Sequence, residues 1–158
     1  MATSCGIIPY HLDGNGDLVF FVGHPGGIYN AHKDYWALLK GGCEDFDVDL
    51  KETAIREFQE ESSYILTDEN KFMMEYLGFV QQNPKKKVHA FSMYINNIDC
   101  SKCHSNLCPD GLTPEIDKYR WMTWKELESK THKTHKMFYE KIINDFYINV
   151  DNTNLKRF

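Results

Sequence analysis

The sequence predicts one α+β domain over residues 1–158, a mixed β-sheet with helices packed on it. Two segments, Cys5–Tyr10 and Leu18–Gly23, are typical of strands, and a Gly/Asn/Asp cluster suited to a hairpin turn joins them. Residues Val88–Ile95 alternate as the two faces of a strand do. The segment at about His135–Tyr147 carries an apolar stripe at helical spacing.

Four further segments, together with a short helix that begins at Thr123, complete the expected sheet and helices. Asp49, followed three residues later by Glu52, is typical of a capping box at the start of a helix. A second pair of this kind, Thr123 with Glu126, is expected to open a short helix. The four segments are a short strand at Tyr35–Leu39, a helix at Leu50–Glu61, a strand at Phe72–Gln81 and a short strand at Lys118–Met122.

The composition excludes several functional classes. Hydrophobic residues make up 42% of the chain and aromatic residues 14%, so a disordered chain is not expected. A formal charge of −5 argues against binding to nucleic acid through bulk charge. No apolar run approaches the ~20 residues of a membrane span, and Met1–Cys5 lacks the features of a signal peptide. We therefore expect a cytoplasmic protein with reduced cysteines and no membrane partner.

The strongest chemical signal is a cluster of carboxylates on the helix expected at Leu50–Glu61. Glu57, Glu60 and Glu61 stand at i, i+3 and i+4, which brings their Cβ atoms within ~5–6 Å of one another. Like charges at this spacing repel, and a hard divalent cation would remove the conflict. An apolar stripe beside them is formed by Leu50, Ala54 and Phe58.

The residues just upstream favour a metal site, whereas an isolated acidic cluster is often only a solvated helix face. Lys40 offers a cation for phosphate oxygens, and Gly41 and Gly42 offer a flexible turn with exposed carbonyls. Mg²⁺ takes oxygen ligands from one or two carboxylates together with substrate phosphates. The segment therefore predicts metal-assisted attack of water on a phosphorus atom.

Residues 56–61, Arg-Glu-Phe-Gln-Glu-Glu, resemble the catalytic half of the signature of the Nudix hydrolases, with Gly41 or Gly42 at its start. The resemblance extends over nearly the whole chain, through residues 23–27, 36–41, 87–91 and 114–121. It implies an α/β/α sandwich whose mixed sheet is flanked by the catalytic loop–helix–loop and a C-terminal helix. Within this family, the chain is similar to the branch that contains diadenosine-tetraphosphate hydrolase-like enzymes and predicted nucleoside-triphosphate pyrophosphohydrolases.

The resemblance also implies roles for particular residues. Glu57, Glu60 and Glu61 would bind Mg²⁺, with Mn²⁺ as a substitute, and the Gly41 carbonyl would add a ligand. Arg56 would orient Glu57.

Two more residues receive roles from the same resemblance. Lys40 would hold a substrate phosphate. Glu115 would be a later-loop carboxylate that acts as a metal ligand or as the base, so the general base is either Glu57 or Glu115.

Two positions depart from the pattern. The loop before the helix is one residue longer, so Asp45, Asp47 and Asp49 compete for the role of the acidic residue that supports the loop and Arg56. Ser63 stands where the pattern has glycine, which costs about 1 kcal/mol if that residue is left-handed. Neither departure removes an expected ligand.

Three further residues are candidates for contact with substrate. Lys87 ends a run of three lysines at an expected turn, where it is either solvated or captures phosphate. His24 and His89 lie on an expected loop and strand, where histidines serve structural roles as well as binding roles.

The polar loop expected at Cys100–Leu112 carries a second possible metal site. Cys100, Cys103, His104 and Cys108 fall within nine residues, which suits zinc, but free thiols on an inserted loop are the simpler interpretation. The turn after Leu12 also resembles the start of a calcium loop, but a hairpin tip is the preferred interpretation, because Leu18 stands where that loop needs glycine and His24 where it needs the closing glutamate.

The leading hypothesis is therefore a Mg²⁺-dependent hydrolase of a phosphoanhydride bond in a nucleoside diphosphate linked to another group. A dinucleoside polyphosphate or a nucleoside triphosphate is the expected small-molecule partner. Alternatives are an RNA cap or nucleotide-sugar hydrolase, a nucleotide-binding Nudix module with little turnover, and a zinc-stapled interaction module. The sequence leaves the oligomeric state open.

Overall fold

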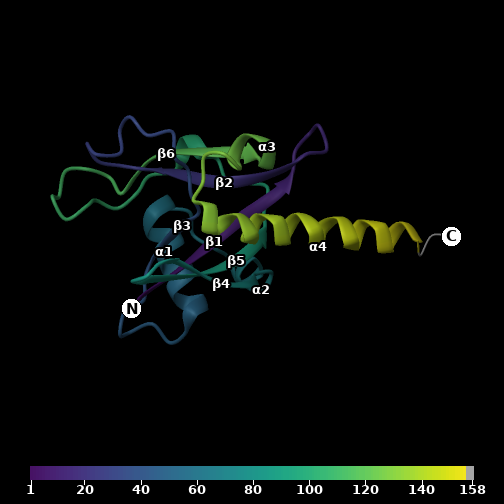
Figure 1. Ribbon diagram of the computed structural model, residues 1–158, viewed down its shortest axis with the longest axis horizontal. Helices are drawn as coiled ribbons and strands as arrows, with labels where there is room; N and C mark the ends of the chain where they lie inside the picture. The colour runs from purple at the N-terminus through teal and green to yellow at the C-terminus, as the bar shows by residue number, and fades with distance from the viewer. Residues whose placement is uncertain (156–158) are drawn as a thin grey trace.

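The computed structural model describes residues 1–155, with side chains to Asp151 (Figure 1). The strands are β1 (Ala2–Leu12), β2 (Leu18–Pro25), β3 (Leu39–Gly42), β4 (Glu75–Asn83), β5 (Lys86–Tyr94) and β6 (Ile116–Thr123). The α-helices are α1 (Leu50–Ser62), α2 (Asp68–Phe72), α3 (Trp124–Leu127) and α4 (Lys136–Leu155). Two short 3₁₀ turns are η1 (Cys100–Lys102) and η2 (Lys133–His135).

Strand β1 organises the sheet, which has the order β4-β5-β1-β2-β6 with β3 also paired to β1. On one side β1 runs parallel to β5, and on the other its two halves have different antiparallel partners. Its last residues pair with β2, whereas Ser4–Ile7 pair with β3. This division brings Gly41 of β3 opposite Cys5, at the edge of the sheet face that α1 covers.

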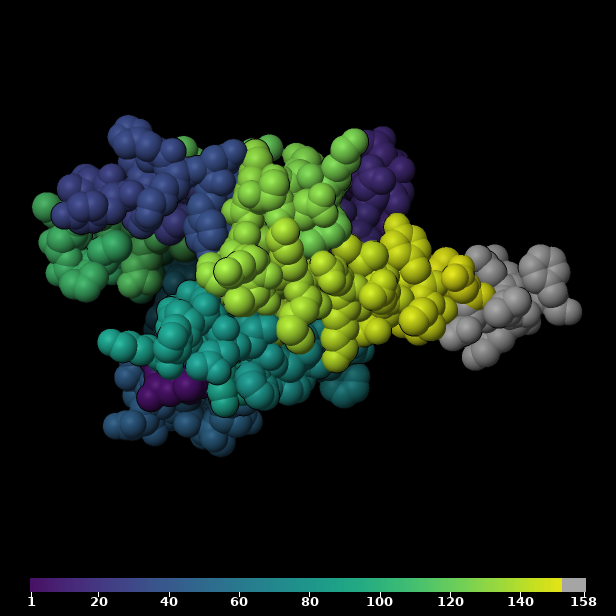
Figure 2. Space-filling model, in the orientation of Figure 1, coloured from purple at the N-terminus to yellow at the C-terminus, as the bar shows by residue number. Residues whose placement is uncertain are grey.

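Each face of the sheet has its own apolar core. Phe138, Tyr139 and Ile142 of α4 pack on one face with Phe20 and other buried side chains. Figure 2 shows the yellow surface of α4 lying against the teal surface of the β4 and β5 region and continuing past it. Ala54 and Phe58 of α1 pack on the opposite face. The sheet is thus sandwiched between helices, which confirms the expected α+β architecture.

Two expected elements differ from the structure. The short strand expected at Tyr35–Leu39 is formed instead at Leu39–Gly42, because Ala37 makes only an isolated bridge to Gly23. The strand expected from Phe72 begins later, because residues 68–72 form α2. A reciprocal capping box between Thr67 and Asn70 starts this helix, a signal that the β-rich composition after it obscured.

None of the helices in the described part of the chain is long and apolar enough to cross a membrane.

Candidate active site

Helix α1 begins and ends through local side-chain contacts. The Asp49 side chain accepts a hydrogen bond from the Glu52 backbone N–H at 2.8 Å, and the Glu52 carboxylate accepts one from the Val48 N–H at 2.9 Å. The helix ends at Ser63, whose φ of 60° is left-handed. The Ser63 Oγ donates to the His104 carbonyl at 2.7 Å, which compensates part of the cost of a non-glycine residue there.

The three carboxylates of α1 have unequal environments. Glu57 and Glu61 are buried, with exposed fractions of 8% and 5%, whereas Glu60 is exposed. Gly41 of β3 lies directly under the Glu57 carboxylate, so a Cβ on Gly41 would overlap it. The absence of a side chain at this position therefore makes room for the carboxylate.

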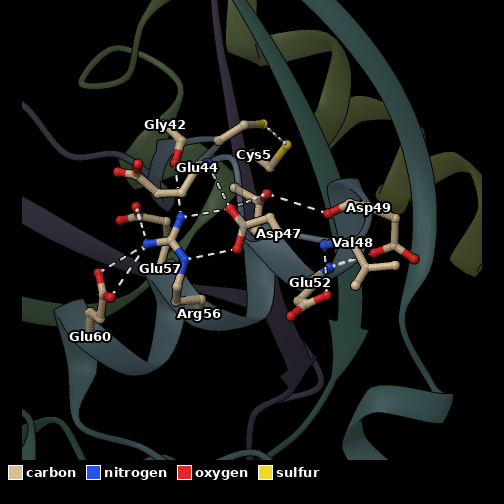
Figure 3. A network of polar contacts seen from close by, with 12 residues as sticks. Cys5, Gly42, Glu44, Asp47, Val48, Asp49, Glu52, Arg56, Glu57 and Glu60 are labelled. Carbon is tan, nitrogen blue, oxygen red and sulfur yellow. Dashed lines mark hydrogen bonds and ion pairs between the residues drawn. The ribbon is translucent and has the colours of Figure 1, made fainter.

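Arg56 is the centre of the polar network in Figure 3. Its Nε and one terminal nitrogen donate to the two carboxylate oxygens of Asp47 at 3.0 and 2.9 Å. The other terminal nitrogen donates to Glu57 at 2.9 Å and lies 3.4 Å from Glu60. The Gly42 carbonyl accepts from Arg56 at 3.0 Å. The guanidinium thus orients Glu57 and ties the loop before α1 to the helix.

Asp47 is the acidic residue that supports the loop, which decides between the three aspartates considered from the sequence. Besides Arg56, it accepts hydrogen bonds from the Thr53 Oγ1 and the Glu44 N–H, both at 2.8 Å. These contacts hold the pKa of the Asp47 carboxyl far below its usual value, with the Arg56 hydrogen bond as the largest cause. Asp49 caps the helix instead.

Glu61 lies near two other carboxylates, those of Glu57 and Glu115. Burial, followed by repulsion from Glu57 and Glu115, raises the pKa of Glu61 to about 9. Burial also raises the pKa of Glu57. One oxygen of Glu61, Oε2, is buried without a hydrogen-bond partner. Two buried carboxylates and an unpartnered oxygen are donors that a hard divalent cation would satisfy.

The carboxylate oxygens of Glu57 and Glu61 are ligand types that a divalent cation prefers, although the described side chains do not surround a single ion position. Among them, no three His, Cys, Asp or Glu side chains are arranged to hold one ion. The reason is visible in the network, because Arg56 holds Glu57 and lies near Glu60.

Glu115 reaches this site through the loop that precedes β6. The loop packs on the end of α1, since the Asn106 N–H donates to the Glu60 carbonyl at 3.0 Å and the Glu115 N–H to the Asn106 carbonyl at 2.9 Å. Tyr119 also donates to the Glu61 carbonyl. The resulting cleft has a volume of about 560 Å³ and is lined by Lys40, Gly41, Gly42, Glu44, Phe46, Arg56, Glu57, Glu60, Glu61, Asn106 and Glu115.

Lys40 lines the same cleft, and Lys86 of β5 lies near it. Burial, followed by repulsion from Lys86, lowers the pKa of Lys40 to about 8. The expected partner, Lys87, instead places its ammonium 4.4 Å from the centre of the Phe79 ring. The sequence did not single out Lys86 as the neighbour of Lys40, because three consecutive lysines cannot be told apart by pattern. In the strand, Lys86 and Lys87 point to opposite faces of the sheet.

The two histidines proposed for substrate binding have different surroundings. His24 is buried, and its Nδ1 and Nε2 lie 2.7 Å from Asp117 and 2.6 Å from the Lys33 carbonyl. These contacts hold the 26–35 loop to β6 and leave no ring nitrogen for a substrate. His89 is half-buried on β5, where its Nδ1 lies 2.7 Å from the Tyr76 hydroxyl.

The cysteine-rich loop does not form a metal centre in the described part of the chain. All five cysteines are free thiols. Cys100 and Cys103 pack against the apolar core under α1, and His104 is exposed. Apolar packing of these thiols favours an inserted loop over a zinc-stapled module.

The chain matches a model of a known protein family. The NUDIX domain model matches residues 5–146, which include β3, α1 and the loop that carries Glu115. The chain belongs to the Nudix family. This match confirms the enzyme class expected from residues 56–61, a Nudix-type pyrophosphohydrolase.

Solved structures share the Nudix fold at low identity. The C. elegans Ap4A hydrolase in a binary complex matches at 18% identity and a TM-score of 0.63, over 94% of this chain and 99% of that chain. The NUDIX domain of Shewanella oneidensis NrtR, complexed with ADP ribose, matches at 10% identity and a TM-score of 0.65, over 90% and 86%. A MutT/nudix protein from Enterococcus faecalis matches at 14% identity and a TM-score of 0.56, over 77% of this chain and 43% of that one. No curated protein sequence matches the chain.

Proposed function

We propose that this Nudix domain uses Mg²⁺ to hydrolyse a phosphoanhydride bond in a nucleoside diphosphate linked to another group, either a dinucleoside polyphosphate or a nucleoside triphosphate. The observation that carries the proposal is the pair of buried carboxylates, Glu57 and Glu61, set against Gly41 in one cleft. Arg56 pairs with Glu57 but leaves Glu61 Oε2 without a partner, so Glu61 can be an anion at neutral pH only with a further cation beside it. A divalent ion that also binds phosphate would supply that cation. Mn²⁺ is expected to substitute for Mg²⁺.

Each residue of the cleft has a task in this proposal. Glu57, Glu60 and Glu61 would hold the metal together with the Gly41 carbonyl, and the metal would neutralise the pyrophosphate and lower the pKa of a bound water. Arg56 keeps Glu57 in position through the 2.9 Å hydrogen bond.

The remaining two residues act on the substrate and the water. Lys40, which lines the cleft, would bind a phosphate oxygen. Either Glu57 or Glu115 would accept the proton of the attacking water.

Two of the similar structures support the choice of substrate class. One is an Ap4A hydrolase, and another holds ADP ribose, so both concern a nucleoside joined to a second group through phosphates. The cytoplasmic location stays a prediction, which fractionation of cells that express the tagged chain would test.

The experiment is a panel of dinucleoside polyphosphates, nucleoside triphosphates, nucleotide sugars and capped RNA, assayed with and without Mg²⁺ in ¹⁸O-labelled water. The label identifies the phosphorus that is attacked. We expect Glu60→Gln and Glu61→Gln each to lower turnover by at least ~100-fold with the fold intact. Glu128→Gln, a change of an exposed glutamate outside the cleft, is the matched control. If the chain binds nucleotides but hydrolyses no member of the panel, it is a nucleotide-binding module and the proposed hydrolysis is wrong.

The pH dependence of the rate distinguishes the two candidates for the general base, Glu57 and Glu115. Glu57→Gln and Glu115→Gln are compared over pH 5–9, because loss of the base removes the acidic limb of the profile, whereas loss of a metal ligand lowers the rate and weakens metal affinity. The variant that loses the limb and keeps its affinity for Mg²⁺ identifies the base.

A further inference from the structure

Two thiols are in contact beside the catalytic cleft. Cys5 of β1 is fully buried, whereas Cys43, the first residue after β3, is exposed. Their Sγ atoms lie 3.7 Å apart, although the two residues are 38 positions apart in the sequence. Figure 3 shows this contact next to the polar network around Arg56. A thiol that solvent reaches therefore touches one that solvent does not reach.

Strand pairing brings the two sulfur atoms together. Cys5 pairs with Gly41, and the Cys43 N–H extends the ladder by donating to the Thr3 carbonyl at 3.1 Å. Side chains two residues apart on a strand point to the same face of the sheet, so Cys43 points to the face on which Cys5 lies. That face is covered by α1, whose Glu57 carboxylate lies over Gly41. The fold thus places both thiols at the edge of the catalytic cleft.

The backbone on both sides of Cys43 belongs to the network that holds α1. The Gly42 carbonyl, just before Cys43, accepts a hydrogen bond from Arg56 at 3.0 Å. The Glu44 N–H, just after it, donates at 2.8 Å to Asp47, which is bonded to the same guanidinium. A movement of Cys43 toward β1 therefore shifts two backbone groups that orient Arg56.

We propose that Cys5 and Cys43 are a site of reversible oxidation, at which a peroxide forms a disulfide that lowers turnover in the cleft. Hydrogen peroxide oxidises the exposed Cys43 thiol to a sulfenic acid and releases one water. The Cys5 sulfur then attacks the sulfenic sulfur, so that the S–S bond forms and the S–O bond breaks. The hydroxide that leaves takes the Cys5 proton and becomes a second water. In total the two thiols lose two electrons, which reduce the O–O bond of the peroxide.

The geometry sets the size of the effect on the site. The S–S bond of a disulfide is ~2.05 Å long, so the two sulfur atoms must approach each other by ~1.6 Å from their separation of 3.7 Å. Cys5 is fixed in the core, whereas Cys43 follows two glycines on an exposed turn, so Cys43 makes most of the movement. A displacement of ~1 Å in a catalytic site costs up to ~100-fold in rate. We expect oxidation to lower kcat/KM by at least ~10-fold; this effect rests on the proposed function, whereas formation of the disulfide does not.

The test compares the reduced chain, the chain treated with a small excess of hydrogen peroxide, and the treated chain after reduction with dithiothreitol. Peptide mapping by mass spectrometry identifies the linked cysteines, and kcat/KM is measured in Mg²⁺ on the best substrate of the panel. Amide hydrogen exchange of residues 42–47 reports on the backbone independently of activity. We expect a cross-link between Cys5 and Cys43, faster exchange at the Glu44 amide, and recovery of activity with dithiothreitol.

Three variants separate the disulfide from other effects of peroxide. Cys43→Ser, a change at an exposed position, should keep the basal activity and become insensitive to peroxide. Cys5→Ala leaves the Cys43 thiol without its partner, so peroxide should not lower kcat/KM if the disulfide is the cause. Cys108→Ser is the matched control, because it removes a thiol from the loop before β6 and should respond to peroxide as the wild-type chain does.

Several results would overturn the inference. Peroxide could link other cysteines, such as Cys100 and Cys103, while Cys5 and Cys43 stay reduced. The cross-linked chain could keep its full activity and an unchanged exchange pattern, or Cys5→Ala could lose as much activity as the wild-type chain. If the reduced wild-type chain hydrolyses no member of the panel, only the proposed function is contradicted, because the peptide map and the exchange pattern still test the disulfide.

Discussion

Replacement of Gly41 by alanine tests the closest contact in the site, that between β3 and the Glu57 carboxylate. A Cβ at position 41 overlaps this carboxylate, so the carboxylate must retreat by more than ~1 Å to regain van der Waals separation. The retreat weakens the 2.9 Å hydrogen bond from Arg56. Gly42→Ala is the matched control, because no atom lies within 4 Å of its added Cβ.

Two magnitudes follow for Gly41→Ala. Overpacking of a filled site costs ~1–3 kcal/mol, which for a chain of this length lowers the Tm by roughly 2–10 °C. A displacement of ~1 Å in a catalytic group costs ~100-fold in rate, equivalent to ~2.7 kcal/mol of activation free energy. We therefore expect kcat/KM to fall by ~100-fold in a chain that stays folded, because a loss of ~1–3 kcal/mol is smaller than the ~5–15 kcal/mol that stabilises a typical domain.

The assay for Gly41→Ala combines steady-state kinetics on the best substrate of the panel with thermal unfolding followed by circular dichroism. The expected pattern is a large loss of kcat/KM with most of the stability retained, and near wild-type values for Gly42→Ala. A fully active Gly41→Ala variant, or equal loss in both variants, would show that the missing side chain at position 41 is not needed to make room for Glu57.

Three other outcomes are expected. Glu61→Gln should raise the free energy of unfolding of the metal-free protein at pH 7 while it lowers turnover, because the Glu61 carboxyl, with its pKa raised to about 9, must take up a proton on folding and the amide need not; chemical denaturation without Mg²⁺ measures this, and a destabilised variant would contradict it. Burial lowers the pKa of His135 to about 3, so below pH ~6.5 this imidazole takes up a proton in the unfolded chain but not in the folded chain. The free energy of unfolding therefore falls by up to ~1.4 kcal/mol per pH unit as the pH drops below ~6.5. His135→Gln should flatten this dependence between pH 6.5 and 5, whereas the exposed control His104→Gln should retain it. Ser63→Ala should destabilise by about 1 kcal/mol through loss of the bond to the His104 carbonyl, whereas Ser63→Gly should be nearly neutral because relief of the left-handed strain offsets that loss; equal effects in urea denaturation would argue against this account.

Much of the fold follows from local patterns in the sequence. The helix at Leu50–Ser62 was expected from its cap at Asp49 and its apolar stripe, and it ends one residue beyond the expected position. Helix α2 was missed because its five residues bury no side chain, so no apolar periodicity marks it. Strand β3 was misplaced because the buried Trp36, Leu38 and Leu39 resemble a strand, whereas the pairing with Ser4–Ile7 of β1 covers only Leu39–Gly42.

The same division holds for the site. Helical spacing alone predicts that Glu57, Glu60 and Glu61 share one helix face and that Arg56 precedes them, because this spacing is a local property of the chain. It could not rank the three carboxylates by burial, since burial depends on which side of the face turns toward β3.

The packing of strands and loops in three dimensions determines which residues from distant segments meet. It selected Asp47 as the partner of Arg56, brought Glu115 to Glu61, and placed Lys86 near Lys40 while Lys87 turned to Phe79. These contacts depend on strand register and on the docking of the loop before β6. A one-residue change of register would exchange the faces of alternate side chains, so no local pattern could specify them.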